Sequence, residues 1–165
     1  MKVWILEQDQ ERSKALRKCV EEYLENIGVK SRIDTFRAPD EVDHALKHQK
    51  KQPAVLLINP DSFDRKQSGL NLAHKIFENN LDISLVLVSE TIAYAYDGYT
   101  VCAEGYIWYG KNLSEQIKHI MKRLHYRYAL EVECLEFFVK RQCVQMPLSK
   151  ISYVESDNHY SIIHT

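Results

Sequence analysis

Acidic and amide side chains follow two short apolar runs in the first third of the chain. Glu7, Gln8 and Asp9 come directly after the run "VWIL". Asn59 ends the run "PAVLLIN", and Asp61 stands two residues later. Carboxylate oxygens bind Mg²⁺ and can accept a phosphoryl group, whereas an amide cannot form an acyl phosphate. The choice between Asn59 and Asp61 therefore decides whether this region can be phosphorylated.

Hydroxyl and cationic side chains follow two later apolar runs. Ser89 ends the run "ISLVLVS", Tyr109 ends "GYIWY", and Lys111 follows two residues after it. Hydroxyl and ammonium groups are donors that can bind phosphate oxygens. Four apolar runs thus carry a polar side chain at or just after their C-terminal ends.

The spacing of apolar residues predicts five strands, each followed by a helix, through residue 128. Strands are predicted at residues 3–6, 29–36, 53–59, 83–89 and 105–109. Leu16, Val20 and Leu24 recur at helical spacing, and Gly28 predicts the end of that helix. The Tyr-rich residues 91–103 predict a fourth, weaker helix. Such alternation predicts an α/β fold with a five-stranded parallel, doubly wound sheet, whose carboxyl edge gathers the polar residues.

The pattern changes after residue 128. Residues 135–140 and 143–146 flank a turn and predict a hairpin, and residues 159–165 predict a further strand. A few short strands rarely form a stable module alone. The sequence therefore predicts two domains, residues 1–128 and an incomplete β-rich module at residues 129–165. We expect this module either to be truncated at Thr165 or to be completed by another chain.

Composition argues against several function classes. The net charge of −1 provides no global basic field for nucleic acid. The four cysteines form no CxxC pair, which indicates mostly buried thiols in a reducing cytoplasm. No signal peptide, membrane span, Gly-rich phosphate loop or nucleophile elbow is evident. The sequence therefore predicts a cytoplasmic protein that is not an enzyme and does not bind membranes.

The polar residues at the strand ends resemble those of response-regulator receiver domains, over about residues 1–125. In that family an acidic pair binds Mg²⁺, an aspartate accepts the phosphoryl group, and a Ser or Thr and a Lys bind the phosphate. The resemblance implies the receiver (flavodoxin-like) fold, a two-component system and a histidine kinase as partner. The positions that match the family's site, or adjoin it, are Glu7, Gln8, Asp9, Asn59, Ser89, Tyr106, Tyr109 and Lys111.

The chain departs from the family at three of these positions. Gln8 replaces one acid of the pair, Asn59 replaces the acceptor, and Tyr109 replaces the lysine. Ser89, Tyr106 and Lys111 remain the expected switch residues. The resemblance implies an atypical receiver that lacks the usual phosphoacceptor. It also implies no cofactor apart from weakly bound Mg²⁺ at Glu7, Gln8 and Asp9, since that ion depends on carboxylates.

Asp61 remains an alternative acceptor. Counting back from Gly69 by the family's interval leads to Asp61 instead of Asn59. Pro60 argues against a strand that continues to Asp61, because proline lacks the N–H that a central strand needs.

The tail resembles the start of a second family, the LytTR-type DNA-binding domain, on the segment "VKRQCVQMPLSKISYVESDNHYSIIHT". The resemblance implies that loop residues beside "NHY" contact base edges and that basic residues contact phosphates. An alternative for Asn158 and His159 is that they only close a hairpin turn. The residues implied to contact DNA are Lys140, Arg141, Lys150, Asp157, Asn158 and His159.

Two function classes follow. The first is a two-component-type response regulator that acts as a DNA-binding transcription regulator and forms a homodimer. The alternative is a phosphorylation-independent interaction or dimerisation module without DNA binding, which aromatic enrichment favours. Whether the reading frame continues past Thr165 discriminates between them. The aromatic residues concerned are Tyr94, Tyr96, Tyr99, Tyr106, Trp108 and Tyr109.

Overall fold

A computed structural model of the chain describes residues 1–49, 52–61, 68–110, 112–132, 134–139, 142–157 and 160–165. By its contacts the chain divides into two compact units, Met1–Met121 and Lys122–Thr165. The boundary between them falls inside the fifth helix, whereas the sequence pattern changes after residue 128. None of the described helices is both long enough and apolar enough to cross a membrane.

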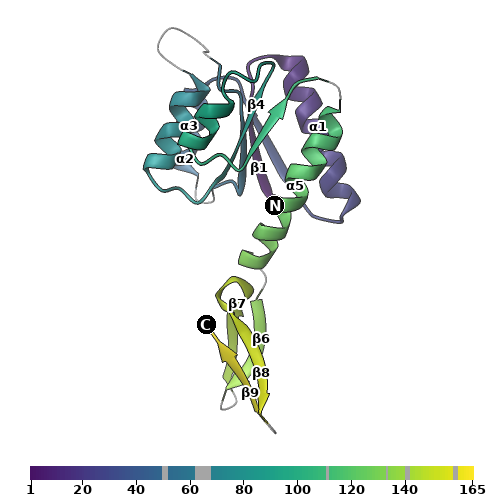
Figure 1. Cartoon of the computed structure of the whole chain (residues 1–165), viewed down its shortest axis with the longest axis vertical. Coiled ribbons are helices and arrows are strands. Elements are labelled where there is room, and N and C mark those ends of the chain that lie inside the picture. The colour runs from purple at the N-terminus through teal and green to yellow at the C-terminus, as the bar shows by residue number, and fades with distance from the viewer. Residues whose placement is uncertain (50–51, 62–67, 111, 133, 140–141, 158–159) are drawn as a thin grey trace. The chain divides into compact units, whose positions relative to one another are not determined.

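The first unit is built on five parallel strands that alternate with helices along the chain (Figure 1). The strand order is β2-β1-β3-β4-β5, so β1 has β2 and β3 as its two neighbours. The predicted α/β fold with a five-stranded parallel sheet is confirmed. The strands are β1 (Lys2–Leu6), β2 (Arg32–Phe36), β3 (Val55–Ile58), β4 (Ser84–Ser89) and β5 (Gly105–Trp108).

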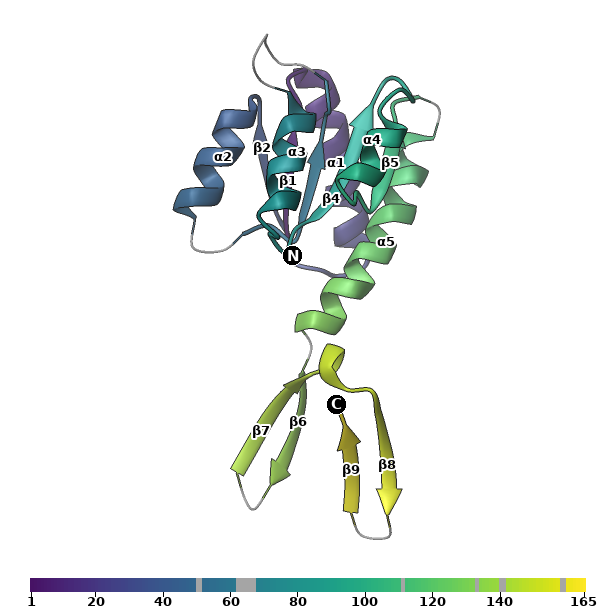
Figure 2. The same ribbon diagram turned by 60° about the vertical axis from the view of Figure 1, so that its left-hand side comes forward.

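Helices cover both faces of this sheet, with α1 and α5 on one side and α2 and α3 on the other (Figures 1 and 2). Side chains alternate between the two faces, so Trp4 and Leu6 pack with the residues of α2 and α3 that face the sheet. The helices are α1 (Gln10–Asn26), α2 (Pro39–His48), α3 (Gly69–Glu78), α4 (Ala95–Thr100) and α5 (Leu113–Val132).

Local side-chain and backbone bonds set the helix ends. Asp9 caps α1, because its Oδ1 accepts the N–H of Arg12 at 2.8 Å. Gly28 has a φ of +71° just after α1, which confirms the predicted helix end. The N–H of Val29 still bonds to the carbonyl of Leu24 at 2.9 Å, so β2 begins at Arg32 and is shorter than predicted.

The fourth helix is also shorter than predicted. It spans Ala95–Thr100, not residues 91–103. Thr91 forms a side-chain turn in which its Oγ1 accepts the N–H of Ala93 at 3.1 Å. Such local bonds compete with helix formation. Cys102, at a φ of +51°, lies beyond the other end.

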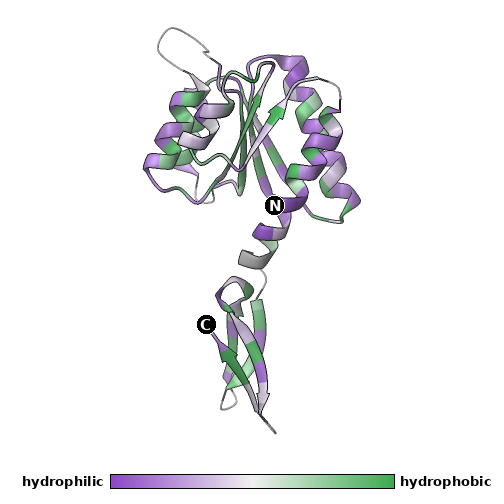
Figure 3. Cartoon of the chain, in the orientation of Figure 1, coloured by the Kyte–Doolittle hydropathy of each residue, from purple (hydrophilic) through white to green (hydrophobic). Residues whose placement is uncertain are grey.

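The second unit contains the C-terminal part of α5, followed by two antiparallel hairpins. The first confirms the predicted hairpin, and the second pairs β9 with a strand that the sequence pattern did not resolve. Both carry large exposed apolar side chains, including Phe138, Val154 and Tyr160. Figure 3 shows hydrophobic colour on these strands as well as on the sheet of the first unit. The elements are β6 (Cys134–Val139), β7 (Gln142–Pro147), the 3-10 turn η1 (Leu148–Lys150), β8 (Tyr153–Asp157) and β9 (Tyr160–His164).

The prediction of mostly buried cysteines is wrong. Cys19 is half-buried on α1, and the other three cysteines are exposed. Cys102 lies in the turn after α4, while Cys134 and Cys143 lie on the exposed hairpin strands.

Candidate functional site

Buried polar side chains occur at the carboxyl ends of three adjacent strands. Glu7, Asn59 and Ser89 are the buried polar side chains in the part of the chain that the structure describes. Glu7 comes directly after β1, Asn59 comes directly after β3, and Ser89 is the last residue of β4. Because these strands are parallel neighbours in the sheet, their ends meet at one edge. Tyr109, directly after β5, joins them there.

Glu7 is the centre of the hydrogen-bond network at this edge. It is 1% exposed. Its Oε2 accepts bonds from the Asn59 side-chain amide at 3.0 Å and from the Tyr109 hydroxyl at 3.2 Å. Its Oε1 accepts the backbone N–H of Asp9 at 2.9 Å. Three donors therefore satisfy a carboxylate that would be costly to bury unpaired.

Arg12, on the first turn of α1, supplies positive charge to Glu7. Its Nη2 lies 3.5 Å from Oε1 of Glu7, and its Nη1 lies 2.6 Å from Oε2 of Glu90. The guanidinium also lies 5.6 Å from the centre of the Tyr109 ring, within range of a cation–π contact. Sequence reasoning missed Arg12. The one signal for it is its place three residues after the helix cap Asp9.

The Tyr109 hydroxyl stays protonated at neutral pH. Burial raises the pKa of Tyr109, and the neighbouring charge of Glu7 raises this pKa further. A neutral phenol can donate to the carboxylate, whereas a phenolate would repel it. Tyr109 therefore serves as a hydrogen-bond donor to Glu7.

Both polar atoms of the Asn59 side chain are engaged. The amide nitrogen donates to Glu7, and Oδ1 accepts the backbone N–H of Asp61 at 2.9 Å. The backbone N–H of Asn59 bonds to the carbonyl of Leu6 at 2.9 Å, which continues the strand pairing. Asn59 thus lies at the strand end, facing Glu7, and Asp61 lies in the loop that follows.

The Asp61 carboxylate, in the loop after β3, raises the pKa of Tyr94 because its negative charge disfavours the phenolate. The backbone of the same loop is held by α3, because the N–H of Gly69 bonds to the carbonyl of Asp61 at 3.2 Å. A Cβ on Gly69 would lie 1.7 Å from the carbonyl oxygen of Asn59. Only glycine permits this approach, so Gly69 fixes the loop against the strand end.

The residues around Ser89 hold the loop between β4 and α4. Ser89 Oγ accepts the N–H of Thr91 at 3.2 Å, and the Tyr106 hydroxyl donates to the carbonyl of Thr91. The Trp108 side chain donates to the carbonyl of Glu90 at 2.9 Å. Glu90 is also the second partner of Arg12, so the loop is tied to the Glu7 network.

No family model matches the sequence, and no curated protein matches it. Solved structures do match. The response regulatory domain of mrkE from Klebsiella pneumoniae has a TM-score of 0.66 and 17% identity, over 78% of this chain and 98% of that chain. The response regulator TrrA from Thermotoga maritima, in complex with Mg²⁺-BeF, has a TM-score of 0.61 and 18% identity, over 74% and 97%.

A DNA-binding response regulator of the LuxR family from Staphylococcus aureus has a TM-score of 0.59 and 14% identity, over 74% of this chain and 97% of that chain. The fold is that of a receiver domain. The predicted receiver fold is therefore confirmed. The metal in the name of the TrrA structure is Mg²⁺, the one cofactor that the sequence prediction allowed.

The Glu7 network leaves few free carboxylate oxygens to bind Mg²⁺ at this edge of the sheet. Both oxygens of Glu7 already accept hydrogen bonds, and Asp9 caps α1. Gln8 is exposed and neutral. Within the described residues, no group of three His, Cys, Asp or Glu side chains could hold a metal. The residues in this arrangement therefore do not fit Mg²⁺.

Several predicted site residues lie outside this network. Lys150 belongs to η1 and is exposed. Asp157 ends β8, and its side chain is outside the described part of the structure. The other predicted positions that fall outside the described residues are Lys111, Lys140, Arg141, Asn158 and His159.

Proposed function

We propose that this chain acts as a two-component-type response regulator whose receiver works without the usual phosphoacceptor. The network around Glu7 carries the proposal. Asn59 stands where the family has the acceptor aspartate, and Tyr109 stands where it has the phosphate-binding lysine. Both side chains donate to Glu7. The substitutions therefore complement one another, and the pocket is stable without phosphate or Mg²⁺.

We infer an output role for the C-terminal unit as the N-terminal part of a LytTR-type DNA-binding domain, residues 129–165. Its two antiparallel hairpins support this role. The name of the Staphylococcus aureus neighbour, a DNA-binding response regulator of the LuxR family, supports a DNA-binding output in general and not the LytTR type. On this proposal the protein is a cytoplasmic, homodimeric transcription regulator with a histidine kinase as upstream partner. Asn158→Ala and His159→Ala should weaken specific DNA binding without changing the fold of the first unit.

Phosphorylation of the intact chain tests the receiver proposal. The chain is incubated with a small phosphodonor and Mg²⁺, and its intact mass is measured. We expect no added phosphoryl group. In the double variant Asn59→Asp, Tyr109→Lys we expect one added group, because it restores the acceptor and the lysine beside Glu7. A phosphoryl group on the unmodified chain that is lost in Asp61→Asn would overturn the proposal and identify Asp61 as the acceptor.

An interaction module without DNA binding is the second candidate. Large apolar side chains are exposed near α4 and β5: Ile92 at 72%, Tyr96 at 77%, Tyr99 at 83% and Trp108 at 51%. Aromatic side chains are enriched at protein interfaces. If this role is correct, Tyr96→Ser with Tyr99→Ser should abolish self-association in analytical ultracentrifugation. If the variant no longer self-associates but still binds DNA, the protein is a DNA-binding regulator that does not need this interface.

A further inference from the structure

A concavity between α1 and the end of β2 is lined by basic and neutral polar side chains. It has a volume of about 190 Å³. Four of its residues recur at helical spacing along one face of α1, and two come from the end of β2 and the residue after it. Three of the six are cations, and none is an acid. The lining residues are Gln10, Ser13, Lys14, Arg17, Thr35 and Arg37.

Two of the three cations in this concavity have no ion-pair partner within the described part of the chain. Lys14 Nζ lies 2.9 Å from Oε1 of Glu11, although both side chains are well exposed. Among the residues that the structure describes, neither Arg17 nor Arg37 has a carboxylate within ion-pair distance of its guanidinium. Glu41 is close by, but its carboxylate accepts the backbone N–H of Arg37 at 2.9 Å. The whole chain has a net charge of −1, so this excess of positive charge is local.

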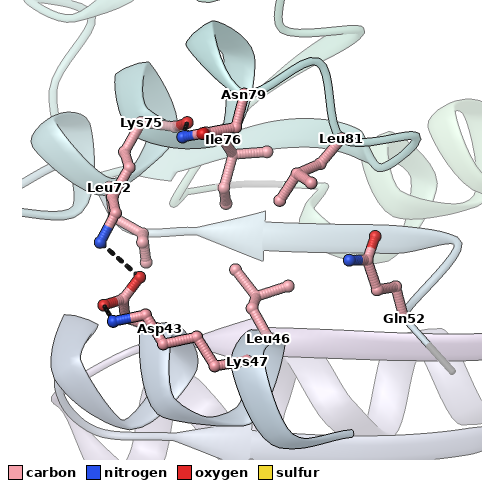
Figure 4. Close-up of a pocket in the computed structure, with 9 residues that line it drawn as sticks. All are labelled: Asp43, Leu46, Lys47, Gln52, Leu72, Lys75, Ile76, Asn79 and Leu81. Atoms are coloured by element: carbon pink, nitrogen blue, oxygen red, sulfur yellow. Dashed lines mark hydrogen bonds and ion pairs between the residues drawn. The ribbon is translucent and has the colours of Figure 1, made fainter. Parts of the chain in front are cut away.

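The hollow between α2 and α3 provides a contrast (Figure 4). It has a similar volume, about 210 Å³, but its floor includes apolar side chains such as Leu72 and Ile76. Its two lysines both pair with Asp43, at 2.9 Å for Lys47 and 2.6 Å for Lys75. These bonds also lower the pKa of Asp43. The hollow between α2 and α3 therefore has no spare charge with which to bind an anion.

We propose that the concavity between α1 and β2 binds the phosphate or diphosphate group of a small ligand. Guanidinium groups bind phosphate oxygens through two parallel hydrogen bonds, and the hydroxyls of Ser13 and Thr35 add donors. Its volume is below the about 300–1,000 Å³ of pockets that enclose drug-sized molecules. It therefore accommodates the phosphate group, while the rest of the ligand stays in solvent. This site is separate from the Glu7 network and does not depend on the proposed function.

Calorimetric titration of the intact chain with pyrophosphate tests the proposal. We expect saturable binding that Arg17→Gln with Arg37→Gln weakens at least tenfold. Lys18→Gln is the matched control, because Lys18 is an exposed cation on α1 outside the concavity and lies 3.8 Å from Glu22. We expect the control to change the affinity less than twofold. Thermal unfolding of each variant confirms that it remains folded.

A second titration, with ADP, distinguishes free diphosphate from a nucleotide. Tighter binding of ADP than of pyrophosphate, with the same dependence on the two arginines, assigns the site to nucleoside diphosphates, and equal binding assigns it to the diphosphate group alone. The proposal is overturned if pyrophosphate shows no saturable binding, or if Lys18→Gln weakens it as much as the double variant. It is also overturned if duplex DNA binds through these arginines while pyrophosphate does not.

Discussion

The carboxyl edge of the parallel sheet buries a charged side chain, whereas the two C-terminal hairpins expose apolar side chains. At the sheet edge a buried carboxylate, Glu7, is surrounded by donors from three other segments of the chain. On the hairpins large apolar side chains such as Phe138, 76% exposed, remain in contact with solvent. The first region has internal partners for its polar groups, and the second has apolar surface still to be covered. The first should therefore tolerate substitution poorly, and the second should tolerate it well.

Replacement of Glu7 should have the largest effect on stability. Glu7→Ala leaves the Asn59 amide and the Tyr109 hydroxyl without their acceptor in a buried place. We expect a loss of about 2–4 kcal/mol in the free energy of unfolding, from two unsatisfied donors and a weakened Arg12 pair. Urea unfolding of the intact chain measures it. The control Glu11→Ala, on an exposed side chain, should change stability by less than about 0.5 kcal/mol. Equal effects of the two would contradict a special contribution of the buried Glu7 network to stability.

Loss of the Tyr109 hydroxyl should have a smaller effect that depends on pH. Tyr109→Phe removes one hydrogen bond to a charged group, which costs about 1.5–3 kcal/mol. The raised pKa of Tyr109 means that its contribution is complete below the ordinary tyrosine pKa of about 10 and is lost as the pH rises through the raised pKa of the folded state. The free energy of unfolding should therefore fall less steeply for the variant than for the unmodified chain as the pH rises from neutral to above about 10. If the free energy of unfolding falls equally with pH in both proteins, Tyr109 is not a buried, neutral phenol.

Replacement of an exposed hairpin side chain should have the smallest effect. Phe138→Ser changes a side chain that is already mostly in solvent, so we expect less than about 0.5 kcal/mol. Chemical unfolding at two protein concentrations measures it. A larger loss that grows with protein concentration would show that another copy covers Phe138 in solution.

Much of the site could be predicted because it depends on strand ends. The apolar runs that predict β1, β3, β4 and β5 also place Glu7, Asn59, Ser89 and Tyr109 at one edge of a parallel sheet. The part played by Arg12 could not be predicted in this way. An arginine in the first turn of a helix is usually a solvated side chain, and its direction toward Glu7 depends on its rotamer and on Glu90, far along the chain. The effect of Asp61 on the pKa of Tyr94 was missed for the same reason.

The sequence by itself determined the order of strands and helices in the first unit and the polar residues at the carboxyl edge, because periodicity and turn residues act over a few neighbouring positions. It also determined that Asn59, which cannot form an acyl phosphate, stands at the end of a buried run. Only the tertiary structure decided which donors satisfy Glu7. The Asn59 and Tyr109 donors are 52 and 102 residues away from it in the chain. Hydrogen bonds over such separations depend on the packing of the whole sheet, which no local pattern specifies.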